Sequence, residues 1–183
     1  MTTVKPVKKK SAAQRLWFLH WLMAAFFLLL FIGGTYMANF LGDAPYRRLF
    51  YDFHKTLGVV VMSLLLARIV VLLAVLRHKY RYRKPKATRE WWQSLILHSF
   101  LYGFMLFMPI SGYMMSNAGN HDVVVFATPI VLPRLFPVDP QLGALGRNLH
   151  FWLGYTFLAA VFLHMAEQWR YLRSQWRRFR RKA

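Results

Sequence analysis

The sequence predicts an all-α membrane protein, a bundle of four transmembrane helices with its N and C termini in the cytoplasm. Apolar side chains make up 57% of the 183 residues, well above the share in ordinary soluble domains. They gather in four runs, each near the roughly 20 residues that a helix needs to span the hydrocarbon core. Basic residues cluster outside these runs, and their distribution predicts the orientation.

The four apolar runs extend from about Leu16 to Phe40, Phe53 to Leu76, Gln93 to Met115, and Leu149 to Trp169. We expect one four-helix domain at 15–172 between basic cytoplasmic tails at 1–14 and 173–183. The first run has no small-residue cleavage site, so we expect a retained helix and not a signal peptide. The long segment 116–148 contains an apolar stretch broken by prolines, and we expect it to lie on the outer surface as a lid.

The charge distribution predicts which loops face the cytoplasm. Nineteen of the 25 Lys and Arg residues lie before the first run, after the fourth run, or in the linker between the second and third runs. The positive-inside rule therefore places the tails and this linker in the cytoplasm of a multi-pass membrane protein. The basic clusters flank membrane spans, so we attribute them to anchoring on the anionic lipid bilayer and not to nucleic-acid binding. The opposite side has only five cations, which are Arg47, Arg48, Lys55, Arg134 and Arg147.

Cysteine is absent from the chain. This excludes a disulfide, a thioether-attached haem, a Cys-ligated iron–sulfur cluster and a thiolate zinc site. Neither a phosphate-binding glycine loop nor a serine nucleophile motif occurs in the sequence.

Four histidines inside the apolar runs pair by depth. His150 and His164 are fourteen residues apart, which puts them on one helix face and roughly 21 Å apart along the axis. From the predicted topology, His54 shares the outer level with His150, and His20 shares the inner level with His164. Two imidazoles at one level suit a six-coordinate haem iron, which also satisfies nitrogens that lack water. The inner level has His98 as a spare.

Small and cationic residues near these histidines support the haem interpretation. Gly58 and Gly154 each follow an outer histidine by four residues, leaving a surface where a porphyrin could lie against the backbone. Arg68, fourteen residues after His54, is at the inner level and suits a haem propionate. The alternatives are interhelical hydrogen bonding for a single histidine and ordinary membrane packing for the small residues. For His98, a structural hydrogen bond, a propionate contact and a quinone contact all stay open.

Several motifs resemble those of the bacterial cytochrome b-561 family of small di-haem membrane cytochromes. They are LHWLMA around His20, HKTLG around His54, the segment MPISGYMMSNAG from Met108 to Gly119, and the pair His150 and His164. The resemblance implies a four-helix bundle with two b haems, ligated by His54 with His150 and by His20 with His164. It also implies electron exchange with ubiquinone, and the family includes a superoxide oxidase.

The expected function is therefore electron transfer across the inner membrane, with exchange at the quinone pool and superoxide as a donor that the resemblance suggests. Bis-histidine iron has no open coordination position, which favours outer-sphere electron transfer over O₂ binding. The alternatives are a membrane anchor and electron relay for a redox partner protein in a larger complex, and a haem-free transporter or scaffold.

Overall fold

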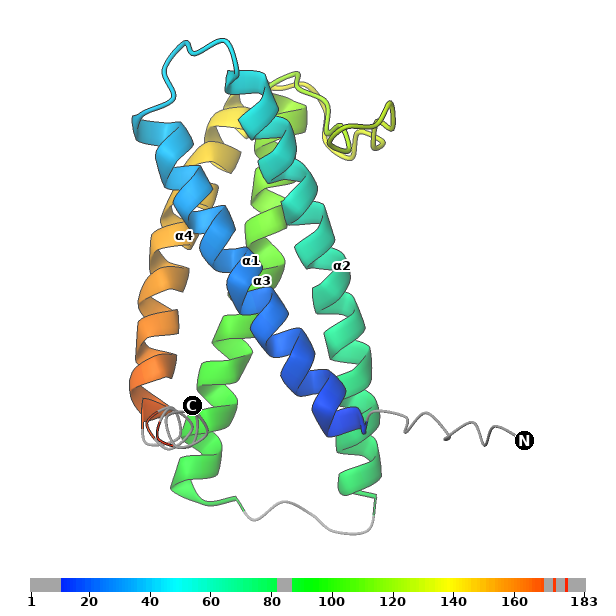
Figure 1. Cartoon of the computed structure of the whole chain (residues 1–183), viewed down its shortest axis with the longest axis vertical. Coiled ribbons are helices and arrows are strands. Elements are labelled where there is room, and N and C mark those ends of the chain that lie inside the picture. The colour runs from blue at the N-terminus through cyan, green and yellow to red at the C-terminus, as the bar shows by residue number, and fades with distance from the viewer. Residues whose placement is uncertain (1–10, 82–86, 170–172, 174–176, 178–183) are drawn as a thin grey trace, which may run out of the picture. The chain divides into compact units, whose positions relative to one another are not determined.

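Four long α-helices account for most of the chain in the computed structural model, which describes residues 11–81, 87–169, 173 and 177. They are α1 (Ala12–Asn39), α2 (Arg47–Lys79), α3 (Arg89–Ala118) and α4 (Pro140–Glu167), as Figure 1 shows. All four are long and apolar enough to cross a membrane. The predicted all-α, four-span class is confirmed. Many of the basic residues in the tails and the linker lie outside the described residues.

The helices begin earlier than the apolar runs, and α1, α3 and α4 each start at a residue whose side chain caps the helix. At the start of α1, the Ser11 hydroxyl accepts from the Gln14 N–H at 3.3 Å, and the Gln14 side chain accepts from the Ser11 N–H at 2.9 Å. This reciprocal capping box satisfies two backbone donors that have no partner in the helix.

The predicted start of the last helix at Leu149 is wrong, since α4 begins at Pro140. The Asp139 carboxylate caps it by accepting from the N–H groups of Gln141 and Leu142 at 2.8 and 3.2 Å. Proline at the first helical position is preorganised for this start. The connection between α3 and α4 is therefore 119–139, shorter than the predicted 116–148.

The chain divides into two compact units. Unit 1 comprises residues 1–85 with 125–127, and unit 2 comprises 86–124 with 128–183. Within the described residues, unit 1 is the hairpin of α1 and α2, and unit 2 is the hairpin of α3 and α4. Each hairpin therefore has a connection end, where its two helices are joined, and an opposite end. The domain limits 15–172 stay a prediction.

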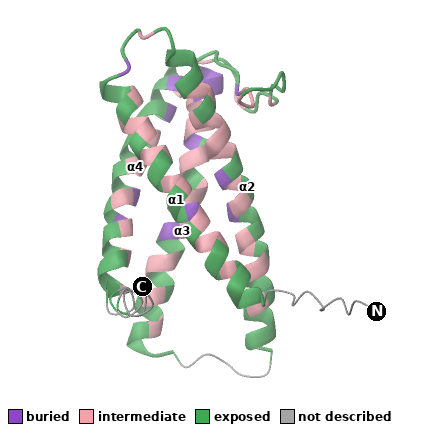
Figure 2. Cartoon of the chain, in the orientation of Figure 1, coloured by how far each residue is buried: buried purple, intermediate pink, exposed green. Residues whose placement is uncertain are grey.

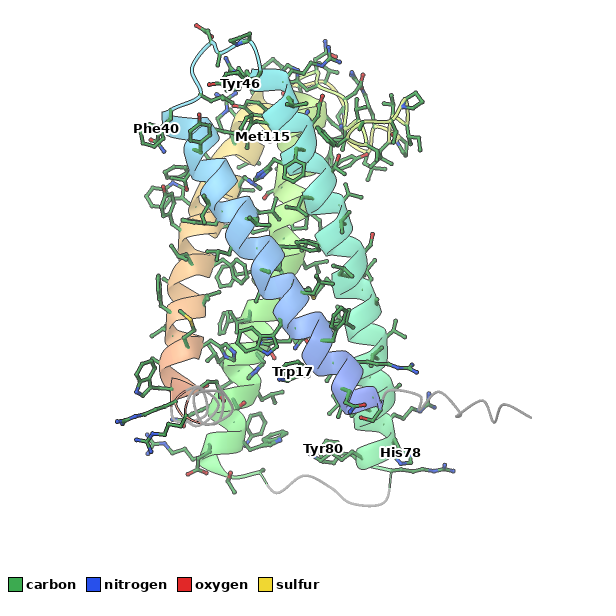
Figure 3. All side chains as sticks on the ribbon, in the orientation of Figure 1. Trp17, Phe40, Tyr46, His78, Tyr80 and Met115 are labelled. Carbon is green, nitrogen blue, oxygen red and sulfur yellow. The ribbon has the colours of Figure 1, made fainter. Side chains whose placement is uncertain are left out.

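The connection end of unit 1 is closed by aromatic contacts and a tight turn. The Tyr36 ring packs on Phe40 and Phe50, with ring centroids 6.0 and 5.5 Å apart. Gly42 has a φ of 46°, which favours glycine. Figure 3 shows Phe40 and Tyr46 at this end, and it shows Trp17 towards the opposite end of α1.

The connection end of unit 2 depends on glycine. A Cβ atom added to Gly146 would lie 2.8 Å from the backbone nitrogen of Met115 and 2.9 Å from its Cα. A Cβ atom added to Gly143 would lie 3.4 Å from the backbone nitrogen of Gly119. Only residues without a side chain allow two helix backbones to come this close.

Burial inside the protein is limited along all four helices. In the most apolar stretch of each helix, only 6 to 11% of the residues are buried inside the protein. Figure 2 shows exposed and half-buried residues along most of each helix. Fully covered side chains such as Met23, Val61 and Leu65 are few among the described residues. Large apolar side chains that face outward are expected where lipid is the solvent.

The close approach at Gly146 generates a stability prediction. We expect Gly146→Ala to lower the thermal stability of the protein, by about 1 to 3 kcal/mol for an overpacked contact, because the added Cβ meets the Met115 backbone. The measurement is thermal unfolding in detergent, followed by circular dichroism. Gly103→Ala is the matched control, since an added Cβ at Gly103 meets nothing within 4 Å. Equal midpoints for the two variants would contradict the packing explanation.

Candidate functional site

The histidines predicted as ligands are distributed over both units. Unit 1 contains His20 and, at its connection end, His54; unit 2 contains His150 at its connection end and His164 near the opposite end. All four side chains are half-buried. Each predicted pair takes one member from each unit, and the pairing stays a prediction.

His54 packs against a glycine pair of the neighbouring helix. A Cβ atom added to Gly34 of α1 would lie 3.4 Å from the His54 Cε1 atom, and one added to Gly33 would lie 4.0 Å from Nδ1. The imidazole therefore lies on a stretch of α1 backbone that carries no side chain.

A cavity of about 90 Å³ opens beside His54 within unit 1. Its other walls are apolar side chains of α1 and α2, with Phe50 and Phe53 among them. A cavity with one imidazole and otherwise apolar walls suits the edge of a flat apolar group held by a nitrogen ligand.

Residues 125–127 pack on α2 next to this histidine. The Phe126 N–H donates to the Thr56 hydroxyl at 2.7 Å, and the Phe126 ring meets Phe53 edge to face at 5.5 Å. Thr56 in turn donates to the Asp52 carbonyl at 2.8 Å. The connection thus carries three residues to the helix that bears His54; its role as a lid over a haem stays a prediction.

His150 is oriented by two acceptors on α3. Its Nδ1 atom lies 3.0 Å from the Met108 carbonyl oxygen and 3.1 Å from the Ser111 hydroxyl. Ser111 is buried and donates its own proton to the same carbonyl at 2.8 Å. A carbonyl oxygen can only accept, so the proton of the neutral imidazole belongs on Nδ1. In this tautomer the lone pair of the ring is on Nε2.

Gly112 permits this approach. A Cβ atom added there would lie 3.0 Å from the Cε1 atom of His150 and 3.2 Å from its Nδ1. The neighbour is a ring already held in place by Ser111 and Met108, so it has little freedom to move away.

His98 lies beside the predicted inner ligand. The rings of His98 and His164 meet edge to face, with centroids 5.1 Å apart and planes at 85°. The Nδ1 atom of His98 lies 2.6 Å from the Ser94 carbonyl oxygen, so this nitrogen donates and Nε2 is the remaining acceptor. His98 is thus a neighbour of His164 within unit 2.

Two arginines near the connection end of unit 1 form local ion pairs. Arg47 pairs with Asp43 at 3.2 Å, and Arg48 lies 3.7 Å from Asp52. These carboxylates reduce the positive charge that Arg47 and Arg48 could offer to an anion. Arg68 lies half-buried in α2; its contact with a propionate stays a prediction.

The comparison with protein families covers both units. The sequence model described as prokaryotic cytochrome b561 matches residues 13–179. The chain belongs to this family. Family membership implies a multi-pass membrane protein that binds haem b and transfers electrons across the membrane. No curated protein matches the chain.

The side chains of this cytochrome fit a haem iron. His150 has its Nδ1 proton bonded to α3, so its lone pair is on Nε2, the type of atom that haem iron takes from an axial histidine. His54 borders an apolar cavity, which suits the low-polarity surface of a porphyrin. Within the described ranges, no three His, Asp or Glu side chains converge to hold a bare metal ion.

The glycines that contact the histidine rings were not among the predicted site residues. The sequence argument named Gly58 and Gly154, whereas the rings lie against Gly33, Gly34 and Gly112. A Cβ added to Gly58 would meet nothing within 4 Å, and one added to Gly154 would lie 3.6 Å from the mobile end of Met108. Both surfaces could still face a haem. The adjacent glycines at 33–34 and the Ser-Gly pair at 111–112 were the available signals.

We expect Gly112→Ala to disturb the ligand at His150 specifically, because the new methyl group would occupy the position of the imidazole. The expected result is a loss or shift of part of the low-spin haem absorbance of the cytochrome. The measurement is the reduced-minus-oxidised spectrum of the purified protein. Gly34→Ala is the matched comparison and should change the spectrum less, since its Cβ would be at ordinary contact distance, 3.4 Å, from His54. Equal spectra for wild type and Gly112→Ala would contradict this role.

Proposed function

We propose that this cytochrome binds two haem b groups and carries electrons across the bacterial inner membrane, with superoxide as donor and ubiquinone as acceptor. The observation that supports it most directly is the orientation of His150. A buried hydroxyl and a carbonyl hold its Nδ1 proton, which directs Nε2 to a ligand in a chain whose family binds haem b.

We propose that His54 and His150 ligate the outer haem, and that His20 and His164 ligate the inner haem. The spacing on α4 supports two levels, because fourteen helical residues separate its two histidines by about 21 Å. In this arrangement α4 provides one ligand to each haem. Gly58 and Gly154 would offer backbone surfaces to the outer haem, and Arg68 would pair with a propionate of the inner one.

In the proposed reaction, superoxide gives up its electrons one at a time at the outer face, and the electrons and protons balance. Two superoxide anions each give up one electron and leave as O₂, and one ubiquinone takes two electrons and two protons to become ubiquinol. Bound haem b supplies one-electron chemistry. The contribution of the protein is to hold the ligand nitrogens and to fix the distance between the two levels.

We propose His98 as a contact for quinone or for a haem propionate at the inner level. Its Nδ1 is already bonded to the Ser94 carbonyl, so only Nε2 can reach a further group. Its edge-to-face position against His164 supports a place beside the inner ligand.

The orientation in the membrane is also part of the proposal. We place a cytochrome domain at 15–172 between two cytoplasmic basic tails, as the charge distribution indicates. With this orientation, the connection ends of the two hairpins face the periplasm, where superoxide would arrive.

The ligand pairing generates a clear prediction for His164→Ala. We expect this variant to lose the inner haem and to retain the outer one, because only the inner pair loses a nitrogen. The measurement is haem content per chain with the low-spin spectrum, and His150→Ala is the matched reciprocal variant. Wild type should hold about two haems per chain, as bis-histidine pairs at two levels require. Retention of both haems in His164→Ala would refute the pairing, and a colourless wild type would refute the whole proposal.

The ion pairs generate a prediction for superoxide-driven quinone reduction. Electrostatic steering falls steeply with ionic strength, but Arg47 and Arg48 are already paired with aspartates. We therefore expect the rate to fall by less than about threefold between low and physiological salt. The measurement is ubiquinol formation by the purified protein with a superoxide source, and superoxide dismutase should abolish it. Without any quinone reduction, co-purification of a soluble redox subunit would instead support the anchor function.

A further inference from the structure

The connection between α3 and α4 carries an exposed apolar surface. Its side chains are Ile130, Val131, Leu135 and Val138, which are 55, 54, 69 and 55% exposed. We call these four residues the apolar ridge. Single exposed apolar residues are common on proteins, but four within nine residues form a patch that needs a partner.

The segment that carries the ridge is folded on itself. Arg134 pairs with Asp122 and donates to the Asn120 side chain, both at 2.8 Å. The Leu132 N–H donates to the Val123 carbonyl at 2.9 Å, and Val124 and Val131 form an isolated antiparallel bridge. The ridge is therefore held by a network of internal bonds.

Polar bonds also fasten the segment to α3. The Tyr113 hydroxyl donates to the Pro133 carbonyl at 2.6 Å, and the Leu135 N–H donates to the side chain of Asn117 at 2.9 Å. Asn117 is completely buried. These bonds hold two backbone polar groups of the segment against α3, while the ridge side chains face outward. A preorganised surface of this kind loses little conformational entropy when it binds.

The position of the ridge indicates its partner. The segment 128–138 joins two membrane-spanning helices, and Figure 1 shows it level with the ends of α3 and α4 and not rising beyond them. A segment that joins the ends of two spans is expected at the membrane interface, where apolar side chains can enter the upper acyl region while backbone groups stay bonded. The residues from Val123 to Pro133 include no charged side chain, which removes the main cost of such insertion.

We propose that the apolar ridge inserts into the lipid leaflet at this end of unit 2 and anchors the connection to the membrane surface. The occupant is the interfacial layer of the bilayer, continuous with the lipid around α3 and α4. Arg134 lies between ridge residues and pairs with Asp122, and this ion pair would then lie at headgroup level.

The absence of cysteine allows a direct test by site-specific labelling. Val131→Cys and, as an independent ridge position, Leu135→Cys are labelled with an environment-sensitive fluorophore in the full-length cytochrome. His121→Cys is the matched control, since this residue is exposed on the same connection but outside the ridge. The proteins are placed in nanodiscs that contain one copy each, and the haem spectrum verifies that each variant is folded.

The ridge labels should show blue-shifted emission, quenching by lipids that carry a spin label near the headgroup, and protection from aqueous iodide. The control label should show none of these. Equal iodide quenching at Val131→Cys, Leu135→Cys and His121→Cys would overturn the proposal. Protection that appears only in preparations with several copies per particle would also overturn it, because the partner would then be a second chain.

Discussion

The structure depends on one constraint, the high free-energy cost of an unbonded polar group in a medium without water. Hydroxyl groups within the helices satisfy this constraint by donating a hydrogen bond to the carbonyl one turn back on the same helix. Three examples are Ser63 to Val59 at 3.0 Å, Ser99 to Leu95 at 2.8 Å and Thr156 to Trp152 at 2.7 Å. These side chains can face lipid without a partner on another helix. The imidazole of His150 is different, because its Nδ1 atom bonds to α3 and not to its own helix. A polar group that its own helix cannot satisfy is where function is expected.

Glycine is the common device that brings the histidines of each hairpin against the neighbouring helix. In unit 1 the His54 ring lies on the backbone at Gly33 and Gly34, and in unit 2 the His150 ring lies on the backbone at Gly112. In both hairpins the histidine belongs to the second helix and the glycine to the first. An aliphatic side chain at any of these glycines would fill the space next to the imidazole ring. The glycines therefore make room for the rings as well as for helix packing. They give each imidazole a flat surface on which its orientation is fixed.

Much of the fold could be predicted from sequence, because length and apolar content suffice to identify a membrane span. The start of α4 could not be found this way, since the apolar run begins at Leu149 whereas the helix begins at its Asp139 cap. At the site, helical spacing identified His150 and His164 as residues of one face. It could not identify Ser111 and Gly112 as contacts of His150, because periodicity gives the face of a helix but not the residue opposite on its neighbour. The family match supports haem b, while the ligand pairs stay a proposal.

The α3–α4 connection is closed at its base. The Asp139 N–H donates to the Ala118 carbonyl at 3.1 Å, and Gly143 lies directly against the backbone of residues 118–119. The distance between α3 and α4 is thus fixed by contacts at the end of α3 and the start of α4, and not by the loop between them. Chain length inside a closed loop costs little, about 0.6 kcal/mol for each doubling. Insertions and deletions between residues 120 and 138 should therefore leave the helix pair unaltered, so that this surface can diverge in evolution faster than the membrane core beneath it.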